Sequence, residues 1–255
     1  MMHKDCMHRP LPDAVKLEFM ENDPLILWAR QDDKPGVRVW RAPDAIVVAA
    51  PDLSRRDRLA LAGDPAAVAK LLADVLPEVG PTYRPIGDED LVAEVAERLG
   101  TIEMAGTFAL MDVAAPVPGP ERGEWLDGDA GVQDFLTVAF PDSYASPGGT
   151  GVRRWAGVRG DDGELLATAA DAWSVPELGF IAGVATHPAA RGRGLATMLC
   201  AFVTNDLLRT HPRVALMADH WNEAALRTYR RLGFTLRSLG VARQTPAAAP
   251  RPAAR

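Results

Sequence analysis

The chain has 255 residues, of which 47% are hydrophobic, and its formal net charge is −6 at pH 7. This length can bury the cores of one or two domains, whereas the acidic balance argues against a nucleic-acid partner, which normally requires a basic patch. The sequence contains no apolar stretch as long as a membrane span, no signal-peptide segment at its start, and only Cys6 and Cys200 as cysteines, so we expect a cytoplasmic protein with no membrane partner and no structural disulfide.

The first half of the chain has the pattern of a mixed α/β structure. Strands are expected at residues 37–40, 45–50 and 107–113, and helices from residue 64 and at residues 88–99. Asp64 and Pro65 provide an N-cap and a first helical residue, and Gly100 ends the second helix. We assign residues 1–115 as an N-terminal mixed α/β domain, which contains no glycine-rich phosphate turn.

The proline-rich segment 114–120 predicts an extended connector to a second domain at residues 122–243. In that domain we expect helices at residues 129–140, from 195 and from 222, and strands at residues 152–158, 164–175, 178–185, 214–218 and 234–241. Residues 244–255 are rich in alanine and proline and predict a disordered tail.

The most specific signal lies between residues 179 and 204, where an apolar strand leads into Gly192 and Gly194 and then into a helix. The apolar stripe of this helix is formed by Leu195, Met198, Leu199, Phe202 and Val203, with Thr204, Asn205 and Arg209 outside it. Glycine allows positive φ and leaves room for a ligand, and the first amides of a helix have no internal partner. The segment therefore predicts a site for a phosphorylated cofactor, with Arg191 and Arg193 adding positive charge.

Two other phosphate-binding motifs fit this spacing less well. A P-loop requires a lysine followed by serine or threonine after its glycines, and none occurs here. A dinucleotide-binding turn requires a third glycine, where this chain has Thr197, and a tight turn directly after the strand, where residues 187–191 intervene. A nicotinamide dinucleotide enzyme is therefore only a third hypothesis.

A pair of motifs in the second domain resembles the GNAT superfamily of acyl-CoA-dependent N-acyltransferases. Arg191, Gly194 and Ala196 satisfy the pattern Arg/Gln-x-x-Gly-x-Gly/Ala. The pattern Asn-x-x-Ala-x-x-x-Tyr-x-x-x-Gly-Phe follows at Asn222, Ala225, Tyr229, Gly233 and Phe234. The residues also make local sense, because Asn222 is a good helix N-cap and Gly233 suits the position after the helix. The resemblance covers residues 122–243.

This resemblance implies a mixed, mostly antiparallel sheet flanked by helices, preceded by the second mixed α/β half. That first half is either a degenerate GNAT-like domain or an unrelated substrate or dimerisation module. The resemblance also implies acetyl-CoA, or another short acyl-CoA, as the donor, bound in a V-shaped gap between two strands. The residues expected to bind it are Val184, Ala185, Thr186, Arg191, Gly192, Arg193, Gly194, Leu195, Ala196, Thr197 and Asn222.

For catalysis, the resemblance implies Tyr229 as the general acid that protonates the departing thiolate. A core role for Tyr229 and a helix-cap role for Asn222 are the alternative interpretations. Many relatives carry a glutamate as base on the strand before the phosphate turn, but Phe180 stands at that point. The candidates for the base are Glu177, Asp171, Asp219 and His220. His187 is expected to be structural or exposed, and Cys200 to be a small buried residue.

Two functions follow from these patterns. The leading hypothesis is an N-acyltransferase that moves the acetyl group of acetyl-CoA directly to a primary amine of a small or amino-acid-like molecule, without a metal ion. The alternative is a non-catalytic acyl-CoA sensor, because the strand glutamate is missing. The sequence leaves the acceptor open, and a homodimer is compatible with either hypothesis.

Overall fold

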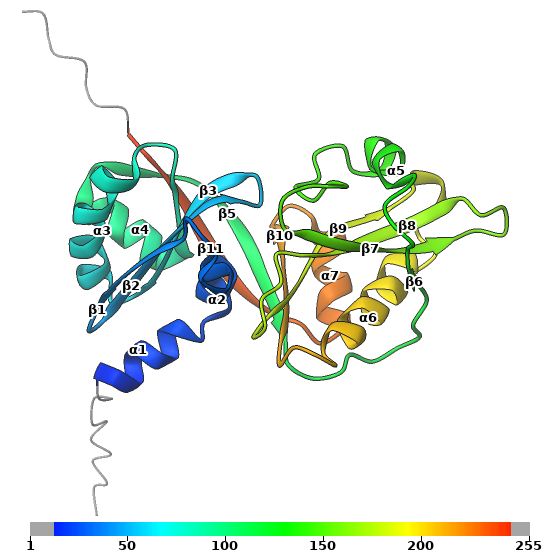
Figure 1. Cartoon of the computed structure of the whole chain (residues 1–255), viewed down its shortest axis with the longest axis horizontal. Helices are drawn as coiled ribbons and strands as arrows, with labels where there is room; N and C mark the ends of the chain where they lie inside the picture. The colour runs from blue at the N-terminus through cyan, green and yellow to red at the C-terminus, as the bar shows by residue number, and fades with distance from the viewer. Residues whose placement is uncertain (1–12, 246–255) are drawn as a thin grey trace, which may run out of the picture.

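The computed structural model describes residues 13–245, which form one large sheet with helices on both of its faces (Figure 1). The strands are β1 Arg38–Ala42, β2 Ala45–Leu53, β3 Arg56–Gly63, β4 Arg84–Asp88, β5 Ile102–Val113, β6 Glu124–Trp125, β7 Val152–Arg159, β8 Leu165–Ala172, β9 Gly179–Thr186, β10 Val214–Asp219 and β11 Thr235–Gln244. The helices are α1 Asp13–Glu21, α2 Pro24–Arg30, α3 Pro65–Val79, α4 Glu89–Leu99, α5 Val132–Ala139, α6 Leu195–Leu207 and α7 Glu223–Arg231, with 3₁₀ turns at Gln31–Asp33 and Pro188–Ala190.

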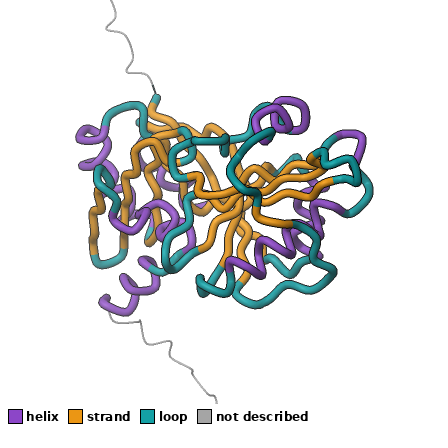
Figure 2. Tube along the Cα trace, turned by 45° about the vertical axis from the view of Figure 1, so that its right-hand side comes forward, coloured by secondary structure: helices purple, strands orange, loops and turns teal. Residues whose placement is uncertain are grey.

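All eleven strands belong to a single sheet in the order β1-β2-β3-β4-β11-β5-β10-β9-β8-β7-β6. Only the neighbours β3–β4 and β9–β10 are parallel, and every other pair is antiparallel. This confirms the expected mixed, mostly antiparallel sheet, which differs from the parallel sheet of dinucleotide-binding folds. Figure 2 shows the strands side by side through the middle of the molecule, with the helices outside them.

The two halves of the chain repeat one structural unit. The series β3, α3, β4, α4, β5 in the first half matches β9, α6, β10, α7, β11 in the second, and the first two strands of each series are parallel. The last strands are exchanged, because β5 lies between β10 and β11 while β11 lies between β4 and β5. Each half therefore contributes a strand to the sheet of the other.

One face of the sheet is concave and encloses α2; we call it the concave face. Trp28 of α2 stacks on Phe180 of β9 with 5.5 Å between ring centroids, and the guanidinium carbon of Arg58 on β3 lies 6.0 Å from the Trp28 ring. Strands β3 and β9 are five spacings apart in the sheet, about 24 Å if it were flat, so the sheet curls around the helix. Helix α5 packs on the same face, whereas α3, α4, α6 and α7 cover the other.

The predicted helix boundaries are confirmed where capping residues mark them. The Asp64 carboxylate accepts hydrogen bonds from the amides of Ala66 and Ala67, both at 3.0 Å, and Pro65 is the first residue of α3. Gly100 ends α4 with a φ of +63°. These caps form because a carboxylate can satisfy free amides and glycine can adopt the left-handed region.

The sequence patterns do not predict α1, α2, β3 or β4. Strand β3 begins with the charged residues RDR, and β4 (RPIGD) contains proline and glycine. Aspartate, proline and glycine are unfavourable in strands. Helix α2 is only seven residues long, too short to show a helical period. Its Asp23-Pro24 start, with Asp23 accepting from the Leu25 amide at 2.8 Å, is the same signal that marks α3 and was available in the sequence.

Three further expectations need correction or lie beyond the described residues. Thr204 is 0% exposed, because α6 also buries Cys200 and Ala201 and its buried face is wider than the predicted stripe. Gln244, expected in the tail, is the last residue of β11 and pairs with Ile102, while residues 246–255 and Cys6 lie outside the described part. Within residues 13–245, no helix is long and apolar enough to cross a membrane.

Candidate active site

Strands β9 and β10 diverge at their carboxyl ends and leave a gap in the sheet. Their parallel pairing ends at the pair Leu216 and Ile181, although β9 continues to Thr186 and β10 to Asp219. On its other edge β9 remains paired with β8 as far as Thr186. The edge of Val184, Ala185 and Thr186 that faces β10 is therefore free of a neighbouring strand, and this is the V-shaped opening that the family resemblance implied.

A β-bulge at Gly183 lies where this opening begins, and the sequence analysis did not single it out. The β8–β9 register shifts there, and Gly183 has a φ of +61°. A Cβ at this position would lie 2.6 Å from the ring of Trp155, so both the backbone and the packing require glycine. An isolated glycine inside an apolar strand is the sequence signal that indicates such a bulge.

The turn after β9 presents free backbone amides at the start of α6. Gly192 and Gly194 have φ values of +78° and +74°, as predicted, and a Cβ at either would meet no atom within 4 Å. No side chain caps α6, and the first amide to bond back is that of Met198, to the Gly194 carbonyl at 3.1 Å. Within the described residues, the amides from Gly192 to Thr197 thus have no hydrogen-bond acceptor, and the helix end favours an anion.

The two arginines of the turn are exposed beside these amides. Arg191 Nε and Nη2 lie 3.4 Å from the carbonyl oxygens of Thr186 and Ala139, respectively. Neither Arg191 nor Arg193 forms an ion pair with a carboxylate in residues 13–245. Before them, His187 caps the 3₁₀ turn by accepting from the Ala189 amide at 3.3 Å, so its structural role is confirmed.

Helix α7 is capped at both ends by residues of the second motif. Asn222 Oδ1 accepts from the Ala225 amide at 3.2 Å, so its carbonyl serves as the N-cap and its amide nitrogen is left for other partners. At the other end the Phe234 amide donates to the Tyr229 carbonyl at 3.0 Å and the Gly233 amide to the Arg230 carbonyl at 3.0 Å, with Gly233 at a φ of +90°. This is a Schellman motif, which explains the Gly-Phe pair of the pattern.

Tyr229 lies on the buried side of α7, 5% exposed, with its ring centroid 5.9 Å from that of Phe234. Burial, with a smaller contribution from neighbouring Cys200, raises the pKa of the phenol well above its ordinary value. Its hydroxyl forms no hydrogen bond with the described residues, yet it is not among the side-chain atoms that are sealed from solvent without a partner. Tyr229 is therefore a protonated phenol whose hydroxyl has no hydrogen-bond partner in the described residues.

Two of the four candidate bases are placed unfavourably. Asp171 Oδ1 accepts from Ser174 Oγ at 2.5 Å and Oδ2 from Arg154 Nε at 3.3 Å, and Arg154 also bonds Asp206 of α6 at 3.1 Å. Its carboxylate is thus held in a network on the α6 side of the sheet. Glu177 is exposed in the turn between β8 and β9.

The other two candidates follow one another at the open end of β10. His220 Nε2 lies 3.3 Å from Ser238 Oγ on β11, so its ring is directed across β5 and away from β9. Asp219 is half-buried and pairs with Phe108 of β5, which packs in the concave-face core. The Asp219 carboxylate thus points to the concave face, and it forms no hydrogen bond or ion pair with the described residues.

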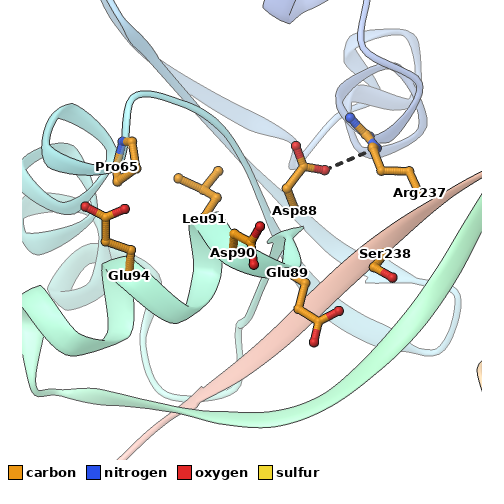
Figure 3. Close-up of a pocket in the computed structure, with 8 residues that line it drawn as sticks. All are labelled: Pro65, Asp88, Glu89, Asp90, Leu91, Glu94, Arg237 and Ser238. Carbon is orange, nitrogen blue, oxygen red and sulfur yellow. Dashed lines mark ion pairs between the residues drawn. The ribbon is translucent and has the colours of Figure 1, made fainter.

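The first half of the chain treats the equivalent helix end differently. Asp64 occupies the first amides of α3 with its own carboxylate, and Pro65 lacks an amide hydrogen. A cavity of about 440 Å³ beside it is lined by Pro65, Asp88, Glu89, Asp90, Leu91, Glu94, Arg237 and Ser238 (Figure 3). Among the carboxylates that line this cavity, Arg237 pairs only with that of Asp88, at 3.2 Å. The remaining carboxylates disfavour a diphosphate, so of the two helix ends only that of α6 suits one.

Comparisons with known proteins agree with this geometry. Residues 130–234 match the Acetyltransferase (GNAT) family. The mycothiol acetyltransferase of Mycobacterium sp. (strain JLS) is 30% identical over 128 residues, which cover 48% of this chain and 39% of the relative. That of Mycobacterium avium (strain 104) is 32% identical over 147 residues, covering 51% and 42%. The chain thus spans about two fifths of the length of these relatives.

Solved structures extend the fold to the first half of the chain. A GCN5-related N-acetyltransferase from Kribbella flavida has a TM-score of 0.62 at 18% identity, with 93% of this chain and 96% of that chain covered. One from Sphaerobacter thermophilus has a TM-score of 0.55 at 17% identity, with 92% and 93% covered. Residues 130–234 of this chain form a GNAT acetyltransferase domain.

Proposed function

We propose that this chain is an N-acetyltransferase that moves the acetyl group of acetyl-CoA directly to a primary amine of a small molecule. The observation that carries the proposal is the run of unpaired amides from Gly192 to Thr197, which opens beside the free edge of β9. The names of the mycothiol acetyltransferase relatives support a small-molecule acceptor. Because those relatives are much longer than the matched segment, the acceptor of this chain is proposed from its own residues.

The residues present fit coenzyme A as a ligand. The amides of Gly192 to Thr197, with Arg191 or Arg193 alongside, would hold the diphosphate. The free backbone edge of Val184, Ala185 and Thr186 would bond the pantetheine arm as if it were an added strand, and the amide nitrogen of Asn222 would donate from the opposite side. Acetyl-CoA supplies an acetyl group activated as a thioester.

Tyr229 would hold the proton that the thiolate requires when it departs. Its raised pKa keeps the phenol protonated across the physiological range, which suits a general acid. Its place in the core cluster that also contains Leu195 of α6 and Leu216 of β10 supports this role.

Asp219 would receive the proton of the acceptor amine, directly or through a water molecule. It is the candidate base with an unengaged carboxylate on the concave face, the side of the sheet opposite α6 and α7. Phe180 of β9, which stands where many relatives carry a glutamate, lies on the same face. In this proposal the carboxylate has moved from β9 to the neighbouring strand.

The test is a thermal-shift comparison of acetyl-CoA, free CoA, NAD and ATP, followed by thiol release from acetyl-CoA across a panel of amines. We expect stabilisation by acetyl-CoA and CoA but not by NAD, because ligand binding to the folded state raises the melting temperature. Thiol release should then depend on an amine. Stabilisation by NAD alone, or by none of the four compounds, would overturn the proposal.

One observation keeps a second function open, that of a non-catalytic acyl-CoA sensor. Phe180 stacks on Trp28 and meets Trp173 edge-on at 6.2 Å, so apolar rings occupy the place of the usual base. A sensor would be stabilised by acetyl-CoA in the same assay but would release no thiol with any amine.

A further inference from the structure

The concave face carries two arginines side by side without a carboxylate. Arg58 of β3 and Arg84 of β4 are direct partners in the parallel ladder, and the next pair along, Ala60 and Ile86, lies in the concave-face core. Both arginines are half-buried, and neither forms an ion pair with any Asp or Glu of residues 13–245. Like charges directly opposite one another weaken a sheet, so this arrangement lacks a counter-charge.

A third arginine on the same face, Arg237, differs from these two because its charge is balanced by carboxylates. Arg237 of β11 binds Asp23 through two nitrogens and Asp88 at 3.2 Å. Although burial opposes it, the contacts with Asp23 raise the pKa of Arg237. Burial lowers the pKa of Arg58, because no carboxylate compensates for the loss of water around it.

Arg58 lies beside two aromatic rings, and the Tyr144 side chain partly offsets the effect of burial on its pKa. Its guanidinium carbon lies 6.0 Å from the Trp28 ring and 5.9 Å from the Tyr144 ring, and its Nε has one distant acceptor, the Leu53 carbonyl at 3.4 Å. Trp28 is 1% exposed, and its indole Nε1 has no hydrogen-bond acceptor in the described part of the chain. A buried donor left unpaired costs about 1–3 kcal/mol, so such groups normally have a partner.

We propose that Arg84 and Arg58, which lies beside Trp28, form a binding site for a carboxylate carried by the acceptor amine. The two guanidinium groups offer donors and no acceptor, and arginine matches a carboxylate through paired hydrogen bonds. The substrate class is then an amino acid or a longer amine with an acidic group, rather than a neutral amine.

The site lies on the face from which the amine would approach, and both halves of the chain build it. The Trp28 ring contacts both Arg58 and Phe180. Phe180 lies on β9, three residues before Gly183, where the opening begins. Tyr144 belongs to the GNAT domain, whereas Arg58, Arg84 and Trp28 come from the first half. The first half, whose own helix end is blocked by Asp64, would therefore serve to recognise the acceptor. This inference rests on the proposed function.

The experiment uses the full chain and a matched set of probes, the ω-amino acids from glycine to 6-aminohexanoate and their carboxamides. Acetyl transfer is measured for each acid and amide with the wild type, Arg58→Gln, Arg58→Lys, Arg84→Gln and the control Arg56→Gln, which changes an exposed arginine of the same strand. We expect the wild type to prefer at least one acid over its amide by about tenfold or more in KM, the order of a charge-assisted hydrogen bond. Arg58→Gln should remove this preference, Arg84→Gln should reduce it, Arg58→Lys should restore part of it, and Arg56→Gln should leave it unchanged.

A binding readout separates this inference from the proposed function. Thermal shifts of the wild type and Arg58→Gln are recorded with the same acids, with their amides and with inorganic phosphate. Acid-specific stabilisation that Arg58→Gln loses would support the site even if no amine were acetylated. Equal use of acids and amides by an active wild type would overturn the carboxylate site while leaving the acetyltransferase intact. Stabilisation by phosphate but by no acid would overturn it as well, because the ligand would then be a phosphorylated molecule.

Discussion

Asp64 and Gly194 occupy the same place in the two repeated units, directly before α3 and α6, and they treat the helix amides in opposite ways. The Asp64 side chain accepts two amide hydrogen bonds at 3.0 Å, whereas Gly194 has no side chain and leaves the amides of α6 open. One chain thus contains a blocked and an open version of the same helix end. At α3 the Asp64 carboxylate, the missing amide hydrogen of Pro65 and the carboxylates of the neighbouring cavity together disfavour a diphosphate. We therefore expect one to bind only at α6.

Gly194→Asp should place a carboxylate on the first amides of α6, as Asp64 does in α3. A carboxylate at this position repels a diphosphate and competes for the amides, so we expect affinity for acetyl-CoA to fall by at least about tenfold. Isothermal titration measures the change, with Gly194→Ala as the control, since its methyl group meets no atom within 4 Å. An Asp variant that binds as tightly as the Ala variant would argue against these amides as the diphosphate site.

Asp64→Ala tests the other helix end. Loss of the N-cap should lower the free energy of unfolding by about 1 kcal/mol, which urea denaturation can detect. The affinity for acetyl-CoA should not change, because α3 takes no part in the proposed site. A second molecule of acetyl-CoA bound by this variant would contradict the assignment of a single diphosphate site.

Tyr229→Phe removes the proposed proton donor and keeps the ring that packs on Phe234. We expect kcat to fall by about a hundredfold, within the range that general acids contribute, while acetyl-CoA binding stays the same. Steady-state thiol release and calorimetric binding measure the two quantities separately. Unchanged turnover would leave Tyr229 as a core residue, which is the alternative interpretation of its burial.

Asp219→Asn and Asp171→Asn form a matched pair, since each changes a carboxylate to an amide in the second half. Asp219→Asn should lower kcat/KM by about a hundredfold with little effect on stability, because its carboxylate has no partner in the described residues. Asp171→Asn should instead lower the free energy of unfolding by about 1–3 kcal/mol. This is less than for a fully buried ion pair, because the partner Arg154 is 42% exposed and water screens the interaction. The opposite outcome would identify Asp171 as the base and Asp219 as a surface residue.

Much of the second half could be predicted from the sequence because its signals are local. The positive φ of Gly192 and Gly194, the cap of α7 by Asn222 and the end of that helix at Gly233 depend on short-range backbone preferences. Periodicity likewise locates α6, although it does not show that Thr204 is buried, since that depends on what packs against the second side of the helix.

The exchange of β5 and β11 could not be predicted, because strand order depends on contacts between residues far apart in the sequence. The proline-rich connector suggested a boundary after residue 115, yet the sheet is continuous across it. The choice among the candidate bases was open for the same reason. Asp219 and His220 are adjacent in sequence, and only strand register and the contact with Ser238 show that their side chains take different directions.

Alkaline pH should destabilise the fold through two buried acids. Burial raises the pKa of the Cys200 thiol from 9.0 to about 12, and burial also raises that of Tyr229. The folded chain therefore keeps protons that the unfolded chain loses. The free energy of unfolding falls by about 1.4 kcal/mol per pH unit for each group, above about pH 9 for Cys200 and above about pH 10 for Tyr229, which are the ordinary pKa values of the two groups.

Urea denaturation between pH 8 and 10.5 measures this dependence. Cys200→Ala should lower stability at pH 8 by about 1 kcal/mol through lost packing, but its decline between pH 9 and 10 should be shallower than that of the wild type. An equally steep decline in the variant would show that the thiol is not the group responsible.

Gly183→Ala should disturb the bulge that opens the gap between β9 and β10. Its methyl group would lie 2.6 Å from the Trp155 ring, and Trp155 is 2% exposed and cannot move aside easily. We expect the free energy of unfolding to fall by about 2–4 kcal/mol, the sum of backbone strain and overpacking. Gly163→Ala is the matched control, because Gly163 also has positive φ, +82°, but has no atom within 4 Å of a Cβ; it should lose only about 1 kcal/mol. If both variants lost the same free energy of unfolding, positive φ alone would explain the need for glycine at the bulge. The contact with Trp155 would then contribute nothing.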